Sequence, residues 1–222
     1  MITQVKKWVT DHPVWFAILF FIFYFTGFFT LEHLVTEPVY LLHCGLDDLI
    51  PFNEWFIFPY ASWFVLIPWA LITLLLFDRK NYFYLCGVMF SGMAMCLLLY
   101  LIFPNGVDLR PQSIESSNLA ATFVRMIWMT DTSTNVCPSI HVASTFAIFL
   151  AVQRSRIWKH RKLVVGICGV LTVMICLSTL FLKQHSVIDV VCGIALSTAL
   201  HFVFRHVGEE EKLLCTVDEI AG

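Results

Sequence analysis

Long apolar runs separated by short polar stretches set the pattern of this chain. Apolar runs of roughly 15–25 residues are the signal for membrane-spanning helices. Six such runs lie at Val14–Val35, Trp55–Phe77, Tyr82–Phe103, Ser139–Val152, Leu163–Leu182 and Val187–Phe204. The fourth is the shortest, and a turn of few residues joins the fifth to the sixth. The pattern predicts an all-α, polytopic membrane protein whose six transmembrane helices form one bundle, a single domain over residues 1–222.

The composition supports this interpretation. Hydrophobic residues make up 59% of the 222 positions, and only 14% are Asp, Glu, Lys or Arg, against about 25% in a soluble domain. These values exclude an ordinary soluble domain. Membrane lipids are the expected surroundings, and no nucleic acid is expected as a partner.

Basic residues are distributed unevenly between the connections. One side of a six-helix alternation carries Lys6, Lys7, Arg79, Lys80, Arg154, Arg156, Lys159, Arg161, Lys162 and Arg205, whereas the other carries Arg110, Arg125 and Lys183. Cytoplasmic connections hold the excess of Lys and Arg in membrane proteins. We therefore expect both termini in the cytoplasm, with 207–222 as a cytoplasmic tail, and the loops 36–54 and 104–138 facing outward.

Two of the runs begin with residues that are costly in a membrane. An Asp at the centre of a spanning helix costs about 2.5–3.5 kcal/mol, and less near the helix ends. Yet His141 opens the fourth run, and His185 and Asp189 open the sixth. The expected topology brings all three to the outer face together with Arg110 and Lys183, so these five residues form one candidate site.

The histidines and the aspartate suit phosphoryl transfer. His185 and Asp189 are four positions apart, so a helix presents them on one face. The carboxylate then fixes the tautomer of the imidazole, and the opposite ring nitrogen becomes a better nucleophile or base. With His141 as a second histidine, the set predicts transfer through a phosphohistidine.

Three further residues suit the binding of an anion. Ser139 follows Pro138 at a helix start, where backbone N–H groups and the helix dipole favour phosphate. Arg110 offers a bidentate contact to phosphate oxygens, and Lys183 supplies a second positive charge. Arg110 is also compatible with a solvated loop residue. Lys183 is also compatible with a side chain that extends to the lipid headgroups.

Three sequence blocks resemble those of the type 2 phosphatidic acid phosphatase (PAP2) superfamily, in its membrane-embedded branch. The family blocks read K-x6-R-P, P-S-G-H and S-R-x5-H-x3-D. They are matched by Arg110-Pro111, by Pro138-Ser139-Ile140-His141 with Ile140 in place of Gly, and by Ser178, His185 and Asp189. The blocks cover about residues 100–195. Two family cations are missing, because Phe103 and Thr179 stand at their positions, and Lys183 is placed to replace the lost charge.

The resemblance implies the roles of the site residues. His185 corresponds to the nucleophile, Asp189 to its orienting carboxylate and His141 to the acid that protonates the leaving oxygen. Arg110 corresponds to a phosphate ligand. The implied activity is a metal-independent phosphatase without a cofactor, acting on a lipid phosphate or pyrophosphate at the outer face of the membrane.

Other interpretations stay open at this point. The same His-His-Asp site suits a headgroup phosphotransferase between lipids, and the loss of two cations suits a catalytically inactive lipid-binding protein. Arg125 and Asp131 are expected to be loop residues, and the Asp47-Asp48 pair to be solvated. Cys44 and Cys137 lie in loops on one side, which would allow a disulfide.

Overall fold

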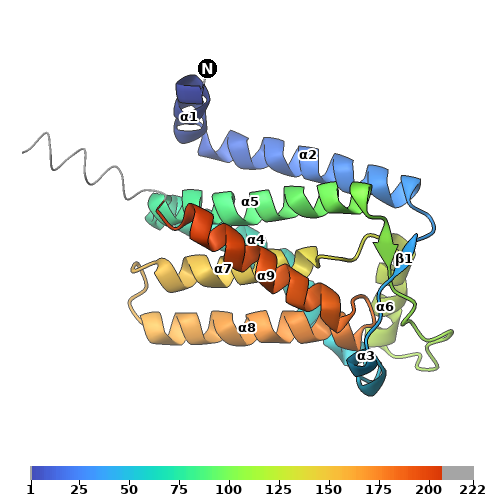
Figure 1. Cartoon of the computed structure of the whole chain (residues 1–222). Helices are drawn as coiled ribbons and strands as arrows, with labels where there is room; N and C mark the ends of the chain where they lie inside the picture. The colour runs from blue at the N-terminus through green and yellow to red at the C-terminus, as the bar shows by residue number, and fades with distance from the viewer. Residues whose placement is uncertain (1, 207–222) are drawn as a thin grey trace, which may run out of the picture.

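The computed structural model describes residues 2–206, and it is helical throughout the six apolar runs (Figure 1). The helices are α1 (Ile2–Asp11), α2 (Pro13–Leu34), α3 (Gly45–Leu49), α4 (Ile57–Phe77), α5 (Arg79–Ile102), α6 (Leu119–Thr130), α7 (Ile140–Arg154), α8 (Arg161–Phe181) and α9 (Val187–Phe204), with a 3₁₀ turn at Glu54–Phe56. Two short strands, β1 (Tyr40–Leu41) and β2 (Asn105–Gly106), pair in parallel. The prediction of an all-α membrane protein is confirmed.

Five of the helices are long and apolar enough to cross a membrane. They are Pro13–Leu34, Glu54–Phe77, Arg79–Ile102, Arg161–Phe181 and Val187–Phe204. α7 has only 15 residues and falls short of the length of a full span. That it crosses the membrane as a sixth span stays a prediction.

The short helix α7 lies at the centre of the bundle. It packs against α4, α5, α8 and α9. Its alanines Ala143, Ala147 and Ala151 are almost completely buried, and small residues let neighbouring backbones approach closely. Because protein surrounds α7 on all these sides, it can carry polar residues that a lipid-facing helix would not tolerate.

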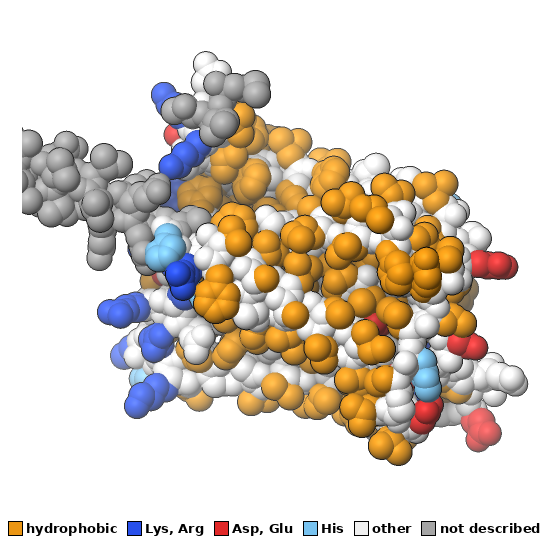
Figure 2. All heavy atoms as spheres, in the orientation of Figure 1, with side chains coloured by type: hydrophobic (Ala, Val, Ile, Leu, Met, Phe, Trp, Pro, Cys, Tyr) orange, Lys and Arg blue, Asp and Glu red, His pale blue; other side chains and the backbone are white. Residues whose placement is uncertain are grey.

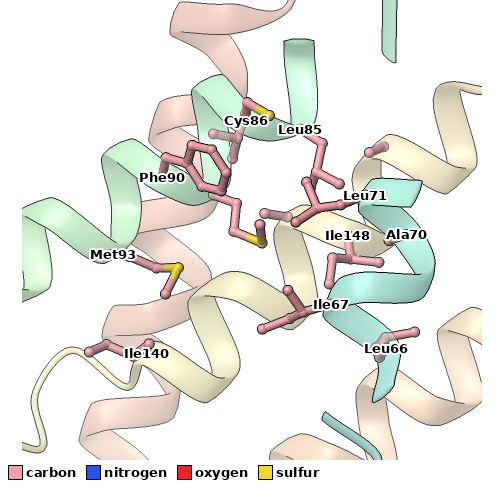
Figure 3. Packing of buried hydrophobic residues seen from close by; sticks show 14 of the residues in the cluster. Leu66, Ile67, Ala70, Leu71, Leu85, Cys86, Phe90, Met93, Ile140 and Ile148 are labelled. Carbon is pink, nitrogen blue, oxygen red and sulfur yellow. The ribbon is translucent and has the colours of Figure 1, made fainter. Parts of the chain in front are cut away.

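The main hydrophobic core lies between α4, α5 and α7 (Figure 3). Residues that meet there include Leu66, Ile67, Ala70 and Leu71 of α4, Leu85, Cys86, Phe90 and Met93 of α5, and Ile140 and Ile148 of α7. Lipid tails are as apolar as these side chains, so dispersion contacts in a closely packed interior hold the helices together.

Charged side chains collect at the two ends of the bundle and leave a hydrophobic belt between them (Figure 2). Lys and Arg lie at the end where the chain enters α2 and leaves α9, whereas Asp and Glu lie at the end that carries α3, β1 and α6. This separation matches the expected asymmetry. Which end faces the cytoplasm stays a prediction, and the predicted tail at 207–222 lies outside the described residues.

The loops at the acidic end are tied to one another. β1 pairs with β2, and Gly106 of β2 bridges to Thr134. A side chain at Gly106 would come within 2.6 Å of the Ser133 carbonyl oxygen, so the strand position requires glycine. The Asn105 Oδ1 accepts hydrogen bonds from the N–H groups of Val136 and Cys137, at 3.1 and 2.7 Å. These contacts fix the segment that leads into α7.

Candidate active site

The two histidines of the sequence motifs meet at the acidic end of the bundle. His141 lies in the first turn of α7, and His185 lies between α8 and α9. Their ring centroids are 5.8 Å apart. Ser139 caps α7, where its Oγ accepts a hydrogen bond of 3.4 Å from the Val142 N–H. The structure therefore brings together two residues that are 44 positions apart in the sequence.

A close contact between α7 and α9 holds the two rings near each other. A side chain at Gly193 of α9 would lie 2.9 Å from the carbonyl oxygen of Ser139. The Ser139 N–H donates to the Asp189 carbonyl at 3.2 Å, and the Ser197 Oγ donates to the Ala143 carbonyl at 2.7 Å. These contacts depend on a glycine, a serine and an alanine, which leave the helices room to approach.

Asp189 is tied to its own helix terminus as well as to His185. It is the third residue of a capping box, in which its Oδ2 accepts from the Ser186 N–H at 2.9 Å. The same oxygen lies 3.3 Å from the Nδ1 of His185, and Asp189 is fully buried. The predicted contact is present, but His185 precedes the N-cap Ser186 and lies outside α9, so the two residues do not share a helix face as expected. With the carboxylate at Nδ1, the other ring nitrogen of His185 is Nε2.

The C-terminus of α8 presents His185 through a tight turn. Gln184 and His185 donate their N–H groups to the Thr179 carbonyl, and the Lys183 N–H donates to the Leu180 carbonyl. Lys183 has a φ of 56°, the left-handed conformation in which such a helix end usually has glycine. Thr179, which stands where the family has an arginine, thus contributes its backbone carbonyl to the site.

Lys183 is not brought to the space in front of the histidines. Its Nζ donates to the carbonyl oxygen of Asp47 at 2.7 Å, and the side chain is buried. Lys183 therefore has a partner in the first outer loop. Binding of substrate phosphate by Lys183 stays a prediction.

Arg110 lies behind the site and is anchored by oxygen acceptors. Its guanidinium donates to the carbonyls of Asp131 and Thr132, at 2.8 and 3.1 Å, and to the Oε1 of Gln184. It also lies 5.3 Å from the ring centroid of Trp128. Burial lowers the pKa of Arg110, although nearby acidic groups oppose the shift. Its role as a phosphate ligand stays a prediction.

A cavity of about 520 Å³ opens in front of the two histidines. It lies between α2, α4 and α6. Its walls are mostly aromatic and aliphatic, and they include Phe25, Phe28, Phe58, Ala61, Phe64, Phe123 and Met126. The ring of His141 packs against Tyr60 and Trp63, with centroid distances of 4.6 and 4.4 Å. Polar residues that line it include Asp131, Thr134, Asn135, Gln184 and the two histidines, together with Tyr60, Tyr100 and Thr130.

Asp131 is a site residue that the sequence interpretation missed. It was expected to be a loop residue, but it lines the cavity and accepts a hydrogen bond of 3.0 Å from the Tyr60 hydroxyl. Burial raises the pKa of its carboxyl, although His185 and Arg110 oppose the shift. Its position ten residues before His141, directly after the apolar helix α6, was the signal in the sequence.

Asp47 corrects a second expectation. The Asp47-Asp48 pair was expected to be solvated, and Asp48 is exposed, but Asp47 is only 2% exposed. Its carboxylate accepts hydrogen bonds from the Val187 N–H, the Ser186 Oγ and the Cys44 N–H, at 2.9, 2.7 and 2.8 Å. Burial favours a raised pKa for Asp47, but these hydrogen bonds outweigh it and lower the pKa. Asp47 thereby fastens the first outer loop to the start of α9.

Two further features concern the predicted loops. Cys44 and Cys137 are free thiols, so the disulfide that the loops would allow is not formed. Arg125 was expected to be a loop residue, but it lies on helix α6, from which it donates to the carbonyls of Ile114 and Ser116 in the outer loop, at 2.8 and 2.5 Å. Within residues 2–206, no cluster of three His, Cys, Asp or Glu side chains is arranged to hold a metal ion.

Comparison with known families agrees with the sequence motifs. The family model described as PAP2 superfamily matches residues 81–212, which include the site residues on α7 and α9 and Arg110. No curated protein matches the chain.

Proposed function

Because the chain belongs to the PAP2 superfamily, we propose that it is a metal-independent lipid phosphate phosphatase that works through a phosphohistidine. The substrate is a lipid phosphate or pyrophosphate, presented at the outer face of the membrane. The family supports phosphatase activity on phosphate esters. The lipid nature of the substrate is argued from the cavity, and the mechanism from the histidine pair.

In the first step, Nε2 of His185 attacks phosphorus. Asp189 lies at Nδ1 and stabilises the positive charge that develops on the ring. His141 donates a proton to the oxygen of the leaving lipid alcohol. In the second step, water attacks the phosphohistidine, His141 takes the proton of that water, and His185 is restored with release of phosphate.

The observation that carries the lipid assignment is the position of both histidines in one wall of an apolar cavity. The opposite walls come from Phe25, Phe64 and Met126, whose exposed fractions are 48%, 59% and 58%. In a membrane these exposed faces contact lipid. A lipid phosphate therefore has room for its chains between α2, α4 and α6 while its phosphate reaches His185.

A panel of lipid phosphates, tested on the purified full chain in detergent, tests the proposal. We expect release of phosphate in the presence of EDTA, inhibition by vanadate, and an acid-labile phosphoenzyme. His185→Ala should abolish both turnover and the phosphoenzyme. His141→Ala should be rescued in part by an aryl phosphate, whose leaving group needs no proton.

His43→Ala is the matched control, because His43 lies in the first outer loop and pairs only with exposed Asp48 among the described residues. It should turn over at the rate of the unmodified protein. A phosphoenzyme on His141 would reverse the assigned roles, and reactivation of EDTA-treated protein by a divalent metal would contradict the mechanism. Complete inactivity on every lipid phosphate would favour the lipid-binding alternative.

A headgroup phosphotransferase remains the second candidate. It uses the same residues, with a lipid alcohol in place of water in the second step. The observation that favours it is that Phe103 and Thr179 replace two family cations while both histidines and the aspartate are kept.

A further inference from the structure

Aromatic side chains, and not hydrogen bonds, hold the ring of His141. Its centroid lies 4.6 Å from that of Tyr60 and 4.4 Å from that of Trp63, at interplanar angles of 37° and 50°. Within residues 2–206, no group makes a hydrogen bond or an ion pair with the imidazole of His141. His185, by contrast, has the carboxylate of Asp189 at its Nδ1. The two histidines of the site are therefore held by different kinds of contact.

Polar contacts fix both aromatic rings. The Tyr60 hydroxyl donates to the Asp131 Oδ2 at 3.0 Å, and the Trp63 Nε1–H donates to the Ser144 Oγ at 2.8 Å. Ser144 lies three positions after His141 on α7. Tyr60 and Trp63 lie three positions apart on α4, so they share one face of that helix, and they are only 1% and 8% exposed. The orientation of both rings relative to His141 is therefore set by fixed partners.

The proposed mechanism needs a protonated His141 in surroundings that disfavour a cation. The cavity walls are mostly apolar, and removal of a charge from water is costly. The ring of His185, 5.8 Å away, gains positive charge when its Nε2 bonds to phosphorus. The face of an aromatic ring attracts a cation within about 6 Å of its centroid. The rings of Tyr60 and Trp63 are thus groups in contact with His141 that favour its imidazolium form.

We propose that Tyr60 and Trp63 are positioning residues, which hold the imidazolium of His141 as the proton donor of the reaction. The inference rests on the proposed function and adds two residues to it. As the bond between phosphorus and the leaving oxygen breaks, its electron pair stays on the oxygen. That oxygen takes the proton of His141, which becomes neutral. Tyr60 and Trp63 act through His141 and exchange no proton themselves.

Two substrates with similar chains separate this role from a structural one. Decyl phosphate releases an alkoxide, which needs a proton, whereas octylphenyl phosphate releases a phenolate, which does not. Tyr60→Leu and Trp63→Leu each remove one ring. Each should lower the turnover number for decyl phosphate about 3- to 30-fold, the effect of one cation–π contact, and change that for octylphenyl phosphate less than about twofold.

Conservative variants and a matched control complete the kinetic test. Tyr60→Phe and Trp63→Phe keep an aromatic face against His141 and should restore most of the turnover of decyl phosphate. Trp69→Leu is the control, because Trp69 lies on the same helix but packs on Trp158 and does not line the cavity. It should keep the ratio of the two turnover numbers. An equal loss with both substrates in the Leu variants, or Phe variants no better than the Leu variants, would overturn the proposal.

A titration of His141 by NMR, on the full chain in detergent, does not depend on turnover. The signal of His141 is the one that His141→Gln lacks. The ionisable groups around this ring are His185 with Asp189, Tyr60, Tyr100, Asp131 and, behind Gln184, Arg110. Trp63→Leu leaves all of them in place, so a change of the midpoint reports the lost ring.

The midpoint should fall by up to about 1.5 pH units in Trp63→Leu and stay unchanged in Trp69→Leu. A lower midpoint leaves fewer molecules with a protonated donor at neutral pH. An unchanged midpoint in Trp63→Leu would overturn the proposal and leave the phosphatase standing. Absence of phosphate release from every lipid phosphate would overturn the phosphatase, and the titration would still decide the role of the rings.

Discussion

The two sides of the site are built in opposite ways. The α8–α9 side, which carries His185, is held by hydrogen bonds that the carboxylates of Asp47 and Asp189 and the Thr179 carbonyl accept. The α2–α4–α6 side consists mainly of aromatic and aliphatic side chains, many of them exposed. Hydrogen bonds are directional and fix a reacting atom, whereas apolar contacts tolerate chains of different shape. Under the proposed function, the reacting groups are thus held rigidly and the lipid chains loosely.

The substitution with the largest expected effect on the α8–α9 side is Asp189→Asn. The amide oxygen still accepts from the Ser186 N–H, so the start of α9 should remain intact. His185 loses the negative charge at Nδ1, and turnover should fall about 10⁴-fold, as a misplaced tautomer does in a hydrolase triad. Rates and phosphoenzyme levels measure the effect, with Asp48→Asn as the exposed control. A loss below tenfold would show that Asp189 serves only the helix cap.

Asp47→Asn tests whether the first outer loop positions His185. The amide keeps one acceptor oxygen but replaces the other by a donor NH₂, so the backbone N–H of either Val187 or Cys44 loses its acceptor. The turnover number should fall about 10- to 100-fold with little change in KM, because a small displacement of a reacting group has this cost. Equal loss in the Asp48→Asn control would contradict the role.

The pH dependence of unfolding gives a second measure of the contact between the Asp47 carboxylate and the start of α9. Hydrogen bonds lower the pKa of Asp47 in the folded chain, so its carboxylate stabilises the fold above the ordinary Asp value of about 4. That contribution is lost as the pH falls through the lowered pKa. Thermal unfolding below about pH 4 should therefore depend less on pH in Asp47→Asn than in the unmodified protein.

Gly193→Ala tests the contact that holds the two histidines together. The new Cβ would lie 2.9 Å from the Ser139 carbonyl oxygen, so α7 and α9 must separate. Turnover should fall about tenfold or more by displacement of His141 from His185. Gly166→Ala on α8 is the control, because its Cβ meets nothing within 4 Å. Equal activity of the two variants would show that the distance between the rings is not critical.

Ala61→Trp tests the α2–α4–α6 side, because the larger side chain fills the cavity. The KM for long-chain lipid phosphates should rise about tenfold, or about 1.4 kcal/mol, whereas short-chain substrates should be little affected. Val65→Trp, one turn along α4 and 68% exposed, lies outside the cavity and serves as the control. An equal effect on both chain lengths would place the lipid chains elsewhere.

Lys183→Gly should have the smallest effect. Glycine adopts the φ of 56° without strain, so the backbone is kept, and the losses are the ammonium contact to Asp47 and the packing of the side chain. If that contact is the role of Lys183, turnover should stay within about threefold, below 1 kcal/mol. A loss of two orders of magnitude in the binding of vanadate would show instead that Lys183 reaches the phosphate.

The sequence by itself determined the helices and singled out the candidate reacting groups. Hydrophobicity in long runs is a local property, and the four-position spacing predicted that Asp189 lies beside His185. His185 itself precedes the N-cap Ser186, so the cap of α9 and not a shared helix face brings the two side chains together. The PAP2 motifs around His141 and His185 are likewise short and continuous. These features therefore needed no knowledge of the folded chain.

Only the tertiary structure decided what surrounds those groups. Asp47 contacts Val187 across 140 positions, and Tyr60 contacts Asp131 across 71. The neighbouring Asp47 and Asp48 differ because α9 covers only the first, and Lys183 turns to the outer loop because the Asp47 carbonyl is within its reach. Burial and hydrogen bonding between distant segments depend on how helices pack, and the pattern of any one segment does not contain that information.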